Sequence, residues 1–329
     1  MEAQEFKSEL KRLAGKVTQY IVAQLDKEPR ILYDASLHLI RSGGKRLRPF
    51  IVVKFYNLYK DDEDLVLPAA AALELVHNFT LIHDDIMDRD EERHGVRTVH
   101  LAYGDEVAIL AGDLLFAIAF QLLSESKALD DARFRKAAKV LSAASVELCE
   151  GQSDDVTSIN REFERNFYFN LINKKTSSLL SAASSIGCLA GGGSDEEVEE
   201  ASLYGRKLGL AFQIVDDLLG VIGDPRVTGK PVGGDLREGK KTLPIFLALQ
   251  RASEEEKELI KAVHGKKYVD QTEIERAVEA IRKLGVEEDV RREAERYAKE
   301  ALDHLYRLPD GKGRPWLVRL VEFVVKRAH

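Results

Sequence analysis

Two aspartates one helical turn apart are the first residues of this sequence with an evident chemistry. They end an apolar segment, residues 69–88, that repeats hydrophobic side chains at helical spacing without a helix breaker. At about 100° per residue, Asp84 and Asp88 share one face with His77, and Asp85 points about a quarter-turn away. Carboxylates on a core helix, at the end where the helix dipole disfavours them, suit a hard cation such as Mg²⁺. We therefore expect Asp84 and Asp88 to bind metal.

A second acidic pair occurs in another apolar segment, LGLAFQIVDDLLGVIGDP, residues 208–225. Gln213, Asp216, Asp217 and Gly220 follow one another at spacings that place them on one face of a helix. Two apolar helices that each carry carboxylates predict a cavity with a metal-lined mouth.

Three clusters of cations lie where an anion could use them. They occur in SGGKRLRPF, in NKKTSS and in the glycine-rich stretch TGKPVGGDLREGKKTLP. The cations are Lys45, Arg46, Arg48, Lys174, Lys175, Lys230, Lys240 and Lys241. Their glycine spacing does not match a Walker loop, which argues against nucleotide binding by that route. Acidic metal ligands combined with separate basic groups predict a site that holds two polyphosphates.

Composition excludes several functional classes. With 49 basic and 56 acidic residues the net charge is −7, and no long basic run occurs, so we expect no nucleic-acid partner. Two isolated cysteines, Cys149 and Cys188, argue against a disulfide framework or a zinc site and favour a reducing, cytoplasmic setting. The N-terminus lacks the apolar core of a signal peptide. The most apolar run, VAILAGDLLFAIAFQLL, contains Asp113 and is shorter than the roughly 20 residues of a membrane span. We expect it to be a buried helix and expect no integral membrane segment.

Helix-forming residues dominate the chain, and only 8 prolines occur. We therefore expect long helices and no strands. Ser194 and Glu197 have the spacing of a capping box, which predicts that a helix begins there. Because no polar linker interrupts the sequence, we expect one all-α domain over residues 1–329. A two-domain split near Pro225–Pro231 stays open as an alternative.

Taken together, the motifs resemble those of trans-type isoprenyl diphosphate synthases. GGKRLRP, DDIMD followed by Arg-x-Gly, the Lys-Thr pair, FQIVDD and GKPVGGDLREGKKT occur in the order of that family, over roughly residues 40–250. The resemblance is closest to the archaeal short-chain members, the geranylgeranyl diphosphate synthases of lipid biosynthesis. It implies a bundle of about a dozen helices around a central apolar cavity, and usually a homodimer. It also implies head-to-tail condensation of isopentenyl diphosphate with dimethylallyl, geranyl or farnesyl diphosphate. Roughly two or three Mg²⁺ ions per site are implied, for which Mn²⁺ can substitute.

The resemblance assigns roles to the matching positions. The metal ligands are Asp84, Asp88 and Asp216, and the catalytic set adds Asp85, Asp217, Lys175 and Lys230. The isopentenyl diphosphate pocket is assigned Lys45, Arg48, His77 and His94. The allylic diphosphate pocket is assigned Arg93, Lys175, Thr176, Gln213, Lys230 and Lys240, and Gln152 and Asp155 match the G-Q-x-x-D element. After the isopentenyl double bond attacks the allylic cation, a proton is lost. In the family the released diphosphate, rather than a side chain, accepts this proton.

Two positions depart from the family pattern. Most members have two arginines before the glycine that follows the first acidic motif. At this place the present chain has Arg93 and His94, followed by Gly95. One diphosphate contact should therefore titrate near neutrality, and isopentenyl diphosphate should bind more weakly at high pH than in a His94→Arg variant. Many members have a third aspartate at the position of Gly220. Whether Asp224 or a water substitutes for it stays open.

Product length is expected to depend on Phe79 and Thr80, just before the first motif. Helix geometry alone does not place Phe79 beneath the carboxylates, because it lies about 140° around the helix from Asp84. An aromatic at position 79 with a non-aromatic at 80 resembles family members that stop at C20, and an added aromatic at 80 resembles C15 producers. We expect a C20 product, with C15 and C25 as alternatives.

Three other functions compete with this one. A class I terpene cyclase shares the aspartate motif and the helical fold, but GKRLRP and the second acidic pair favour a synthase. An HD-type metal phosphohydrolase could use His83 with Asp84, but it would need further histidines at ligand spacing. A non-catalytic partner subunit would have lost metal aspartates or lysines, whereas only His94 and Gly220 depart here.

Overall fold

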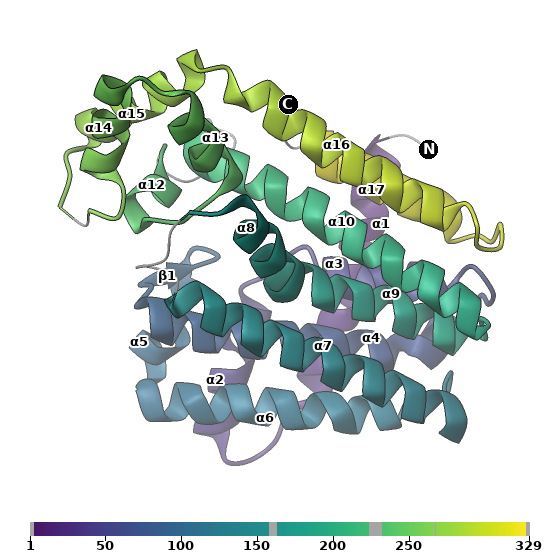
Figure 1. The fold of residues 1–329 in the computed structure, drawn as a ribbon. Coiled ribbons are helices and arrows are strands. Elements are labelled where there is room, and N and C mark those ends of the chain that lie inside the picture. Colours follow the sequence, from purple (N-terminus) through teal and green to yellow (C-terminus); the bar gives the residue numbers. More distant parts are fainter. Residues whose placement is uncertain (1–2, 158–162, 224–231, 267, 327–329) are drawn as a thin grey trace. The chain divides into compact units, whose positions relative to one another are not determined.

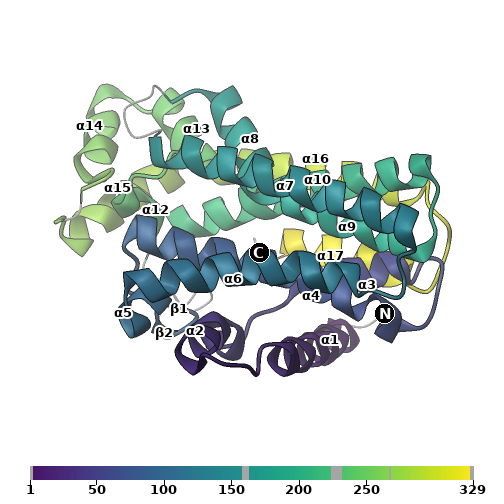
Figure 2. The ribbon, with the colours of Figure 1, turned by 90° about the horizontal axis from the view of Figure 1, so that it is seen from below.

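The computed structural model describes residues 3–157, 163–223, 232–266 and 268–326. The predicted all-α class is confirmed, because the described elements are helices apart from one short hairpin (Figures 1 and 2). The chain divides into two compact units. Unit 1 comprises Met1–Ser145, Leu179–Gly205 and His304–Arg319, and unit 2 comprises Val146–Ser178, Arg206–Asp303 and Leu320–His329. These boundaries do not fall near Pro225–Pro231, and the prediction of one domain stays a prediction.

Unit 1 contains the N-terminal helices and the hairpin. Its elements are α1 (Ala3–Gln24), α2 (Arg30–Arg41), α3 (Leu47–Tyr56), α4 (Glu63–Asp88), β1 (Glu92–Arg93), β2 (Val96–Arg97), α5 (Val99–Tyr103) and α6 (Asp105–Ser124). It also takes most of α9 (Ser178–Gly191) and the first parts of α7 (Asp131–Thr157), α10 (Asp195–Ile222) and α17 (Arg314–Lys326).

Unit 2 contains the later helices. They are α8 (Arg165–Ile172), the π-helical segment η2 (Asn173–Ser177), α12 (Gly234–Glu238), α13 (Leu243–Arg251), α14 (Glu254–Val263), α15 (Gln271–Lys283) and nearly all of α16 (Val286–Leu305). Its core is a cluster of buried aliphatic side chains from α10, α13, α14, α15 and α16, with Tyr168 of α8.

The core of unit 1 is built on α4, which packs along α6 and α3 (Figure 2). Its early turns carry the fully buried run Ala69–Ala72, whose small side chains permit close helix packing. A similar close approach occurs at Gly187 of α9, where an added Cβ would overlap the Val52 carbonyl of α3. The predicted helix over 69–88 is therefore confirmed and begins earlier, at Glu63.

The prediction that VAILAGDLLFAIAFQLL forms a buried helix is wrong in part. The run lies within α6, but Ile109 is 45% exposed and Leu110 is 56% exposed. The reason is that α6 packs on α4 and α2 with one side, whereas its sequence is apolar all round. By length and composition, α4 and α6 could each cross a membrane. For α4, however, 78% of that apolar window is buried, which is typical of a core helix.

The predicted capping box is confirmed at the start of α10. The Ser194 N–H donates to Glu197 Oε2 at 2.7 Å, and the Glu197 N–H donates to Ser194 Oγ at 3.3 Å. The helix that carries the second acidic pair therefore begins at a defined residue, Asp195.

Candidate active site

The first acidic motif lies at the C-terminal end of α4. Asp84 is partly exposed and Asp88 is exposed in the last turn. The helix ends because Arg89 adopts a left-handed conformation (φ 57°), and its N–H bonds to the Asp85 carbonyl. The chain then forms the β1–β2 hairpin, which the sequence did not predict because each strand has only 2 residues. His94 and Gly95 form its turn with positive φ values of 54° and 76°.

The hairpin brings Arg93 to Asp85. Arg93 Nε donates to Asp85 Oδ1 at 2.5 Å, and Arg93 Nη2 donates to Asp90 Oδ2 at 3.1 Å. Asp85 is fully buried, and burial raises the pKa of its carboxyl despite the opposing charge of Arg93. Asp85 thus lies inside unit 1 and fixes the orientation of Arg93, whereas Asp84 and Asp88 lie toward solvent.

The first cation cluster lies in a strained loop before α3. Gly43 and Gly44 have φ values of 112° and 128°, which favour glycine, and Arg46 has a φ of 49°. Lys45 is exposed, whereas Arg46 is buried. Arg48 is partly buried, and burial lowers the pKa of its guanidinium to about 10 although the charge of Glu74 opposes this. Arg48 lies in the first turn of α3, where the positive end of the helix dipole favours a bound anion.

His77 lies among the cations that the sequence assigns to the isopentenyl diphosphate pocket. Burial lowers the pKa of its imidazole well below the ordinary value, and the positive charges of Arg48, Arg46, Arg93 and His94 lower it further. The ring is therefore neutral near pH 7, and it can offer a diphosphate a hydrogen bond rather than a charge.

Phe79 and Thr80 lie on α4, five and four residues before Asp84. The Phe79 ring contacts His83 (centroids 5.0 Å apart) and Phe116 of α6 (5.1 Å), and Phe116 in turn contacts Phe120 (5.3 Å). Thr80 is buried and its hydroxyl donates to the His77 carbonyl at 2.8 Å. Phe79 therefore begins an aromatic row along α6, which fits the predicted role in product length without testing it.

In unit 2, the second acidic motif belongs to a network of four residues. Tyr168 Oη donates to Asp217 Oδ2 at 2.7 Å, and Gln213 Nε2 donates to Asp217 Oδ1 at 2.8 Å. Thr176 Oγ1 donates to Gln213 Oε1 at 2.7 Å. Because Asp217 Oδ1 accepts from the amide nitrogen of Gln213, the amide oxygen of Gln213 faces Thr176. The hydroxyl hydrogen of Thr176 is then used inside the protein, and the oxygen lone pairs remain for a ligand.

The two aspartates of this motif have different surroundings. Asp216 is partly exposed, whereas Asp217 is buried. Burial and the nearby charge of Asp235 raise the pKa of the Asp217 carboxyl to about 7, and its hydrogen bonds only partly offset this. Asp216 is thus the more accessible carboxylate of the pair, and its predicted role as a metal ligand stays a prediction.

Lys175 and Thr176 lie in η2, a π-helical segment between α8 and α9. π-Helical segments are rare in proteins overall, but those that occur are often found at functional sites. Lys175 Nζ donates to Asp155 Oδ2 at 2.6 Å, so the predicted G-Q-x-x-D aspartate orients the predicted lysine. Gln152 is buried, and neither polar atom of its amide has a hydrogen-bond partner among the described residues. A water or ligand atom would satisfy it.

The third cation cluster is only partly described. Lys230 and Asp224 lie outside the described residues, so their predicted roles remain untested. Lys240 pairs with Asp235 at 3.4 Å and Glu238 at 2.5 Å. Burial alone would lower the pKa of Lys240, but these carboxylates raise it. At Gly220, an added Cβ would overlap the Asp235 carboxylate, so this backbone has no room for the family's third aspartate unless Asp235 moves.

The acidic motifs fit a hard divalent cation by donor chemistry. Carboxylate oxygens are the ligands that Mg²⁺ prefers, with water and phosphate completing the coordination. Among the described residues, no three His, Cys, Asp or Glu side chains already gather around a metal position. Asp84 and Asp88 belong to unit 1 and Asp216 to unit 2, and the expectation that the two motifs share one site stays a prediction.

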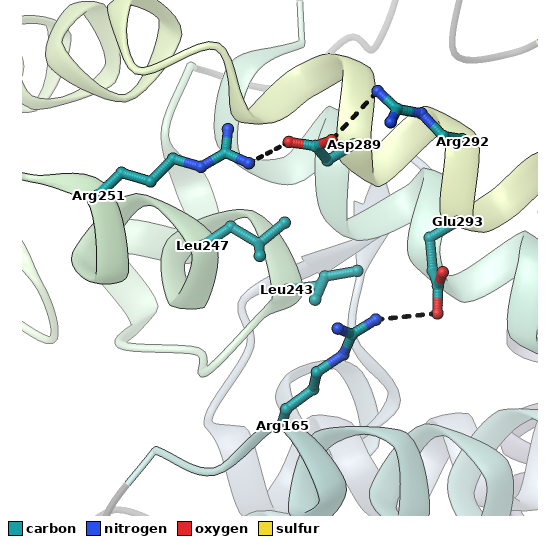
Figure 3. Close-up of a pocket in the computed structure, with 7 residues that line it drawn as sticks. All are labelled: Arg165, Leu243, Leu247, Arg251, Asp289, Arg292 and Glu293. Atoms are coloured by element: carbon teal, nitrogen blue, oxygen red, sulfur yellow. Dashed lines mark hydrogen bonds and ion pairs between the residues drawn. The ribbon is translucent and has the colours of Figure 1, made fainter.

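A surface pocket of about 280 Å³ in unit 2 contains none of the predicted residues (Figure 3). Its guanidinium groups already pair with acids, since Arg165 bonds to Glu293 at 3.1 Å and Arg251 and Arg292 both bond to Asp289. Its lining comprises Arg165, Leu243, Leu247, Arg251, Asp289, Arg292 and Glu293. This pocket is therefore not the candidate site.

Sequence reasoning missed the roles of two residues. Tyr168 lies seven and eight residues, about two helical turns, before the Lys-Thr pair, and this spacing is the only signal of its role in the sequence. Arg46 was grouped with its neighbours as a cation for an anion, but it is buried against Glu74. Its left-handed conformation, which turns the side chain inward, left no signal in the sequence.

Comparison with known proteins identifies the family of the chain. Residues 29–281 match the polyprenyl synthetase family. A short chain isoprenyl diphosphate synthase of Methanocaldococcus jannaschii is 46% identical over 83% of this chain and 82% of its own. A geranylfarnesyl diphosphate synthase of Aeropyrum pernix is 40% identical over 94% of this chain and 99% of its own.

Among solved structures, a geranylgeranyl pyrophosphate synthetase from Pyrococcus horikoshii superposes with a TM-score of 0.91. It is 36% identical and covers 98% of both chains. The chain therefore belongs to the polyprenyl synthetase family.

Proposed function

We propose that this protein is a prenyltransferase that condenses isopentenyl diphosphate head-to-tail with an allylic diphosphate and releases diphosphate. One observation carries the proposal: each unit has its own cations and its own acidic motif. They are Lys45, Arg48, Asp84 and Asp88 in unit 1 and Lys175, Lys240 and Asp216 in unit 2. A reaction that joins two diphosphates needs cations for both of them, whereas a terpene cyclase or a phosphohydrolase binds one diphosphate.

Divalent metal ions are part of the proposal. Asp84 and Asp88 lie one turn apart at the solvent-facing end of α4. This fits Mg²⁺, which takes one or two carboxylates and keeps positions for water and phosphate. We propose roughly two or three Mg²⁺ ions per site, replaceable by Mn²⁺, which offset diphosphate charge when bound.

The described cations supply positive charge in fixed positions. Asp155 orients Lys175, the carboxylates of Asp235 and Glu238 orient Lys240, and Asp85 orients Arg93. Cations held in this way can stabilise charge that grows on a departing diphosphate without reorganising, which is the most effective form of electrostatic catalysis. Neutral His77 adds a hydrogen bond toward the isopentenyl diphosphate, and the released diphosphate takes the proton.

We assign the product to C20 geranylgeranyl diphosphate, on the aromatic row that begins at Phe79. The experiment is incubation with radiolabelled isopentenyl diphosphate and each of the C5, C10 and C15 primers, with and without Mg²⁺, followed by chromatography. All three primers should be extended to C20 only when Mg²⁺ is present. A C15 or C25 end product would change the length assignment, and turnover without isopentenyl diphosphate would overturn the reaction.

We further propose that the protein is a cytoplasmic homodimer formed through α6. Leu101 of α5 and Ile109 and Leu110 of α6 are large apolar side chains 39 to 56% exposed, in a helix that buries only one side. Contiguous exposed apolar surface is typical of protein interfaces. Light scattering should give a dimer for the wild type and a monomer for Leu110→Lys. A wild-type monomer would contradict the assignment.

A further inference from the structure

Arg46, the second residue of the KRLR cluster, is more deeply buried than the neighbouring cations Lys45 and Arg48 and is ion-paired inside unit 1. Its side chain is 3% exposed and Nη1 donates to Oε1 of Glu74, itself 2% exposed, at 2.8 Å. Its charge is thus matched inside unit 1. The Arg46 side chain is therefore not accessible to a diphosphate, whereas Lys45 is exposed.

Arg46 connects four helices of unit 1. Nη2 donates to the Ile40 carbonyl in the last turn of α2 at 2.5 Å, and Nε donates to Thr18 Oγ1 of α1 at 3.4 Å. Glu74 belongs to α4, and the Arg46 carbonyl accepts the first helical hydrogen bond of α3 from Phe50 N–H at 3.0 Å. One side chain therefore fixes where α3 begins relative to its neighbours within the unit.

Neighbouring residues leave space for the Arg46 side chain and orient its partner, Glu74. Arg46 adopts a left-handed conformation, which is costly for a residue with a Cβ. Gly44 must be glycine, because an added Cβ would lie 2.9 Å from Arg46 Nη1 in a backbone that already has a φ of 128°. Asn78 Nδ2 donates to Glu74 Oε1 at 2.9 Å and so orients the carboxylate. Strain of this kind persists only where the surroundings over-determine it.

The loop held in this way carries the assigned diphosphate-binding groups. Lys45 precedes Arg46 directly and Arg48 follows it by two residues, and His77 lies on α4 one turn after Glu74. Arg48 is also within electrostatic reach of Glu74. A shift of this loop would move Lys45 and Arg48 together.

We propose that the buried Arg46–Glu74 pair is the positioning device of the isopentenyl diphosphate pocket. It holds the loop Gly43–Arg46 so that Lys45 and Arg48 meet the diphosphate, and it does not touch the substrate itself. This inference rests on the proposed function, which assigns that substrate to Lys45 and Arg48. The allylic diphosphate, assigned mainly to unit 2 residues, is outside its influence.

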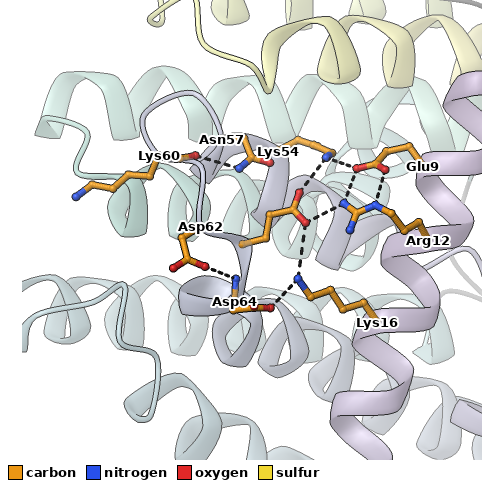
Figure 4. Close-up of polar contacts among 9 residues, drawn as sticks. Glu9, Arg12, Lys16, Lys54, Asn57, Lys60, Asp62 and Asp64 are labelled. Carbon is orange, nitrogen blue, oxygen red and sulfur yellow. Dashed lines mark hydrogen bonds and ion pairs between the residues drawn. The ribbon is translucent and has the colours of Figure 1, made fainter.

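The test compares Arg46→Lys with a control of equal burial, Lys54→Met. Lys54 is also 3% exposed, bonds to Glu9 at 2.6 Å and belongs to a separate network of unit 1 (Figure 4). Arg46→Lys should raise KM for isopentenyl diphosphate roughly tenfold or more, since small displacements of binding groups are costly. Its kcat and the KM for the allylic substrate should stay within about twofold of wild type. Lys54→Met should lower Tm and leave both KM values unchanged.

A double variant, Arg46→Met with Glu74→Leu, separates positioning from stability. Buried ion pairs can often be replaced by apolar residues of similar size without loss of stability. We expect a Tm near that of wild type, with KM for isopentenyl diphosphate still raised. Should this variant not fold by circular dichroism, Arg46→Lys alone decides the matter. A wild-type KM in Arg46→Lys, or equal rises in both KM values, would overturn the inference.

Direct binding distinguishes this inference from the proposed function. Equilibrium dialysis with radiolabelled isopentenyl diphosphate needs no turnover. If the wild-type protein does not bind it, the proposed function fails. If wild type and Arg46→Lys bind it equally, the function stands and only the positioning role is refuted.

Discussion

Asp85 and Asp217 are the second members of the two acidic pairs, and both are buried, although only Asp85 pairs with a cation among the described residues. Each is buried, and each accepts a hydrogen bond from a residue assigned to the allylic diphosphate, Arg93 or Gln213. The first members, Asp84 and Asp216, are more exposed. Each pair therefore combines one carboxylate suited to metal with one that orients a neighbouring side chain.

The buried Asp217 predicts a pH dependence of stability in the metal-free protein. Its pKa is about 7 in the folded chain and near 3.8 when unfolded, so the folded state binds the proton more tightly. Protonated Asp217 therefore adds to the free energy of unfolding. This contribution is complete below the unfolded pKa and is lost as the pH rises to about 7, by an amount on the order of 4 kcal/mol at most. Without metal, the wild-type Tm should fall between about pH 4 and pH 7, and less so in Asp217→Asn. Parallel Tm profiles for the two proteins would refute this assignment.

Phe79 and Thr80 predict changes in product length. Phe79→Ala opens space beside Phe116, so the chain should grow beyond C20, whereas Thr80→Phe fills space and should stop growth at C15. Each variant is incubated with isopentenyl diphosphate and either geranyl or farnesyl diphosphate, and its products are separated by chromatography. If both variants still make the wild-type product, the row at Phe79 does not limit chain growth.

At the level of elements, periodicity predicted the long helices well. The helix over 69–88, the capping box at Ser194 and the acidic faces depend on local spacing, which the sequence states directly. The buried roles of Asp85 and Asp217 could not be read in the same way, because a helical wheel gives direction but not depth.

The other differences arise from contacts between distant residues. The exposure of α6 depends on which side finds a partner, and the sequence of that helix is apolar all round. The β1–β2 hairpin is too short to produce alternation. The inward turn of Arg46 depends on Glu74, 28 residues later.

The close approach of α12 to α10 predicts a local steric effect. In Gly220→Ala, the new Cβ would overlap the Asp235 carboxylate, which must turn away from Lys240. We expect this cost to exceed the gain in helix propensity, so that the free energy of unfolding falls by about 1 kcal/mol. Adding Asp235→Ala should recover most of that loss. Gly234→Ala is the control, because nothing lies within 4 Å of its added Cβ. Urea unfolding of the four proteins checks this, and equal stability of Gly220→Ala and wild type would contradict the packing.

At the scale of the whole molecule, the chain has two compact units that each carry cations and an acidic motif. Neither set alone accounts for a reaction between two diphosphates, which is why membership of the polyprenyl synthetase family and the paired motifs matter together. A cyclase or a phosphohydrolase would act on a single diphosphate. A requirement of turnover for both substrates therefore distinguishes the proposed reaction from these two.

Release of inorganic diphosphate tests that claim most directly. It is measured with Mg²⁺ in the presence of isopentenyl diphosphate alone, farnesyl diphosphate alone, and both together. We expect release only when both substrates are present, at one diphosphate for each isopentenyl diphosphate consumed. Equal release from farnesyl diphosphate alone would contradict it.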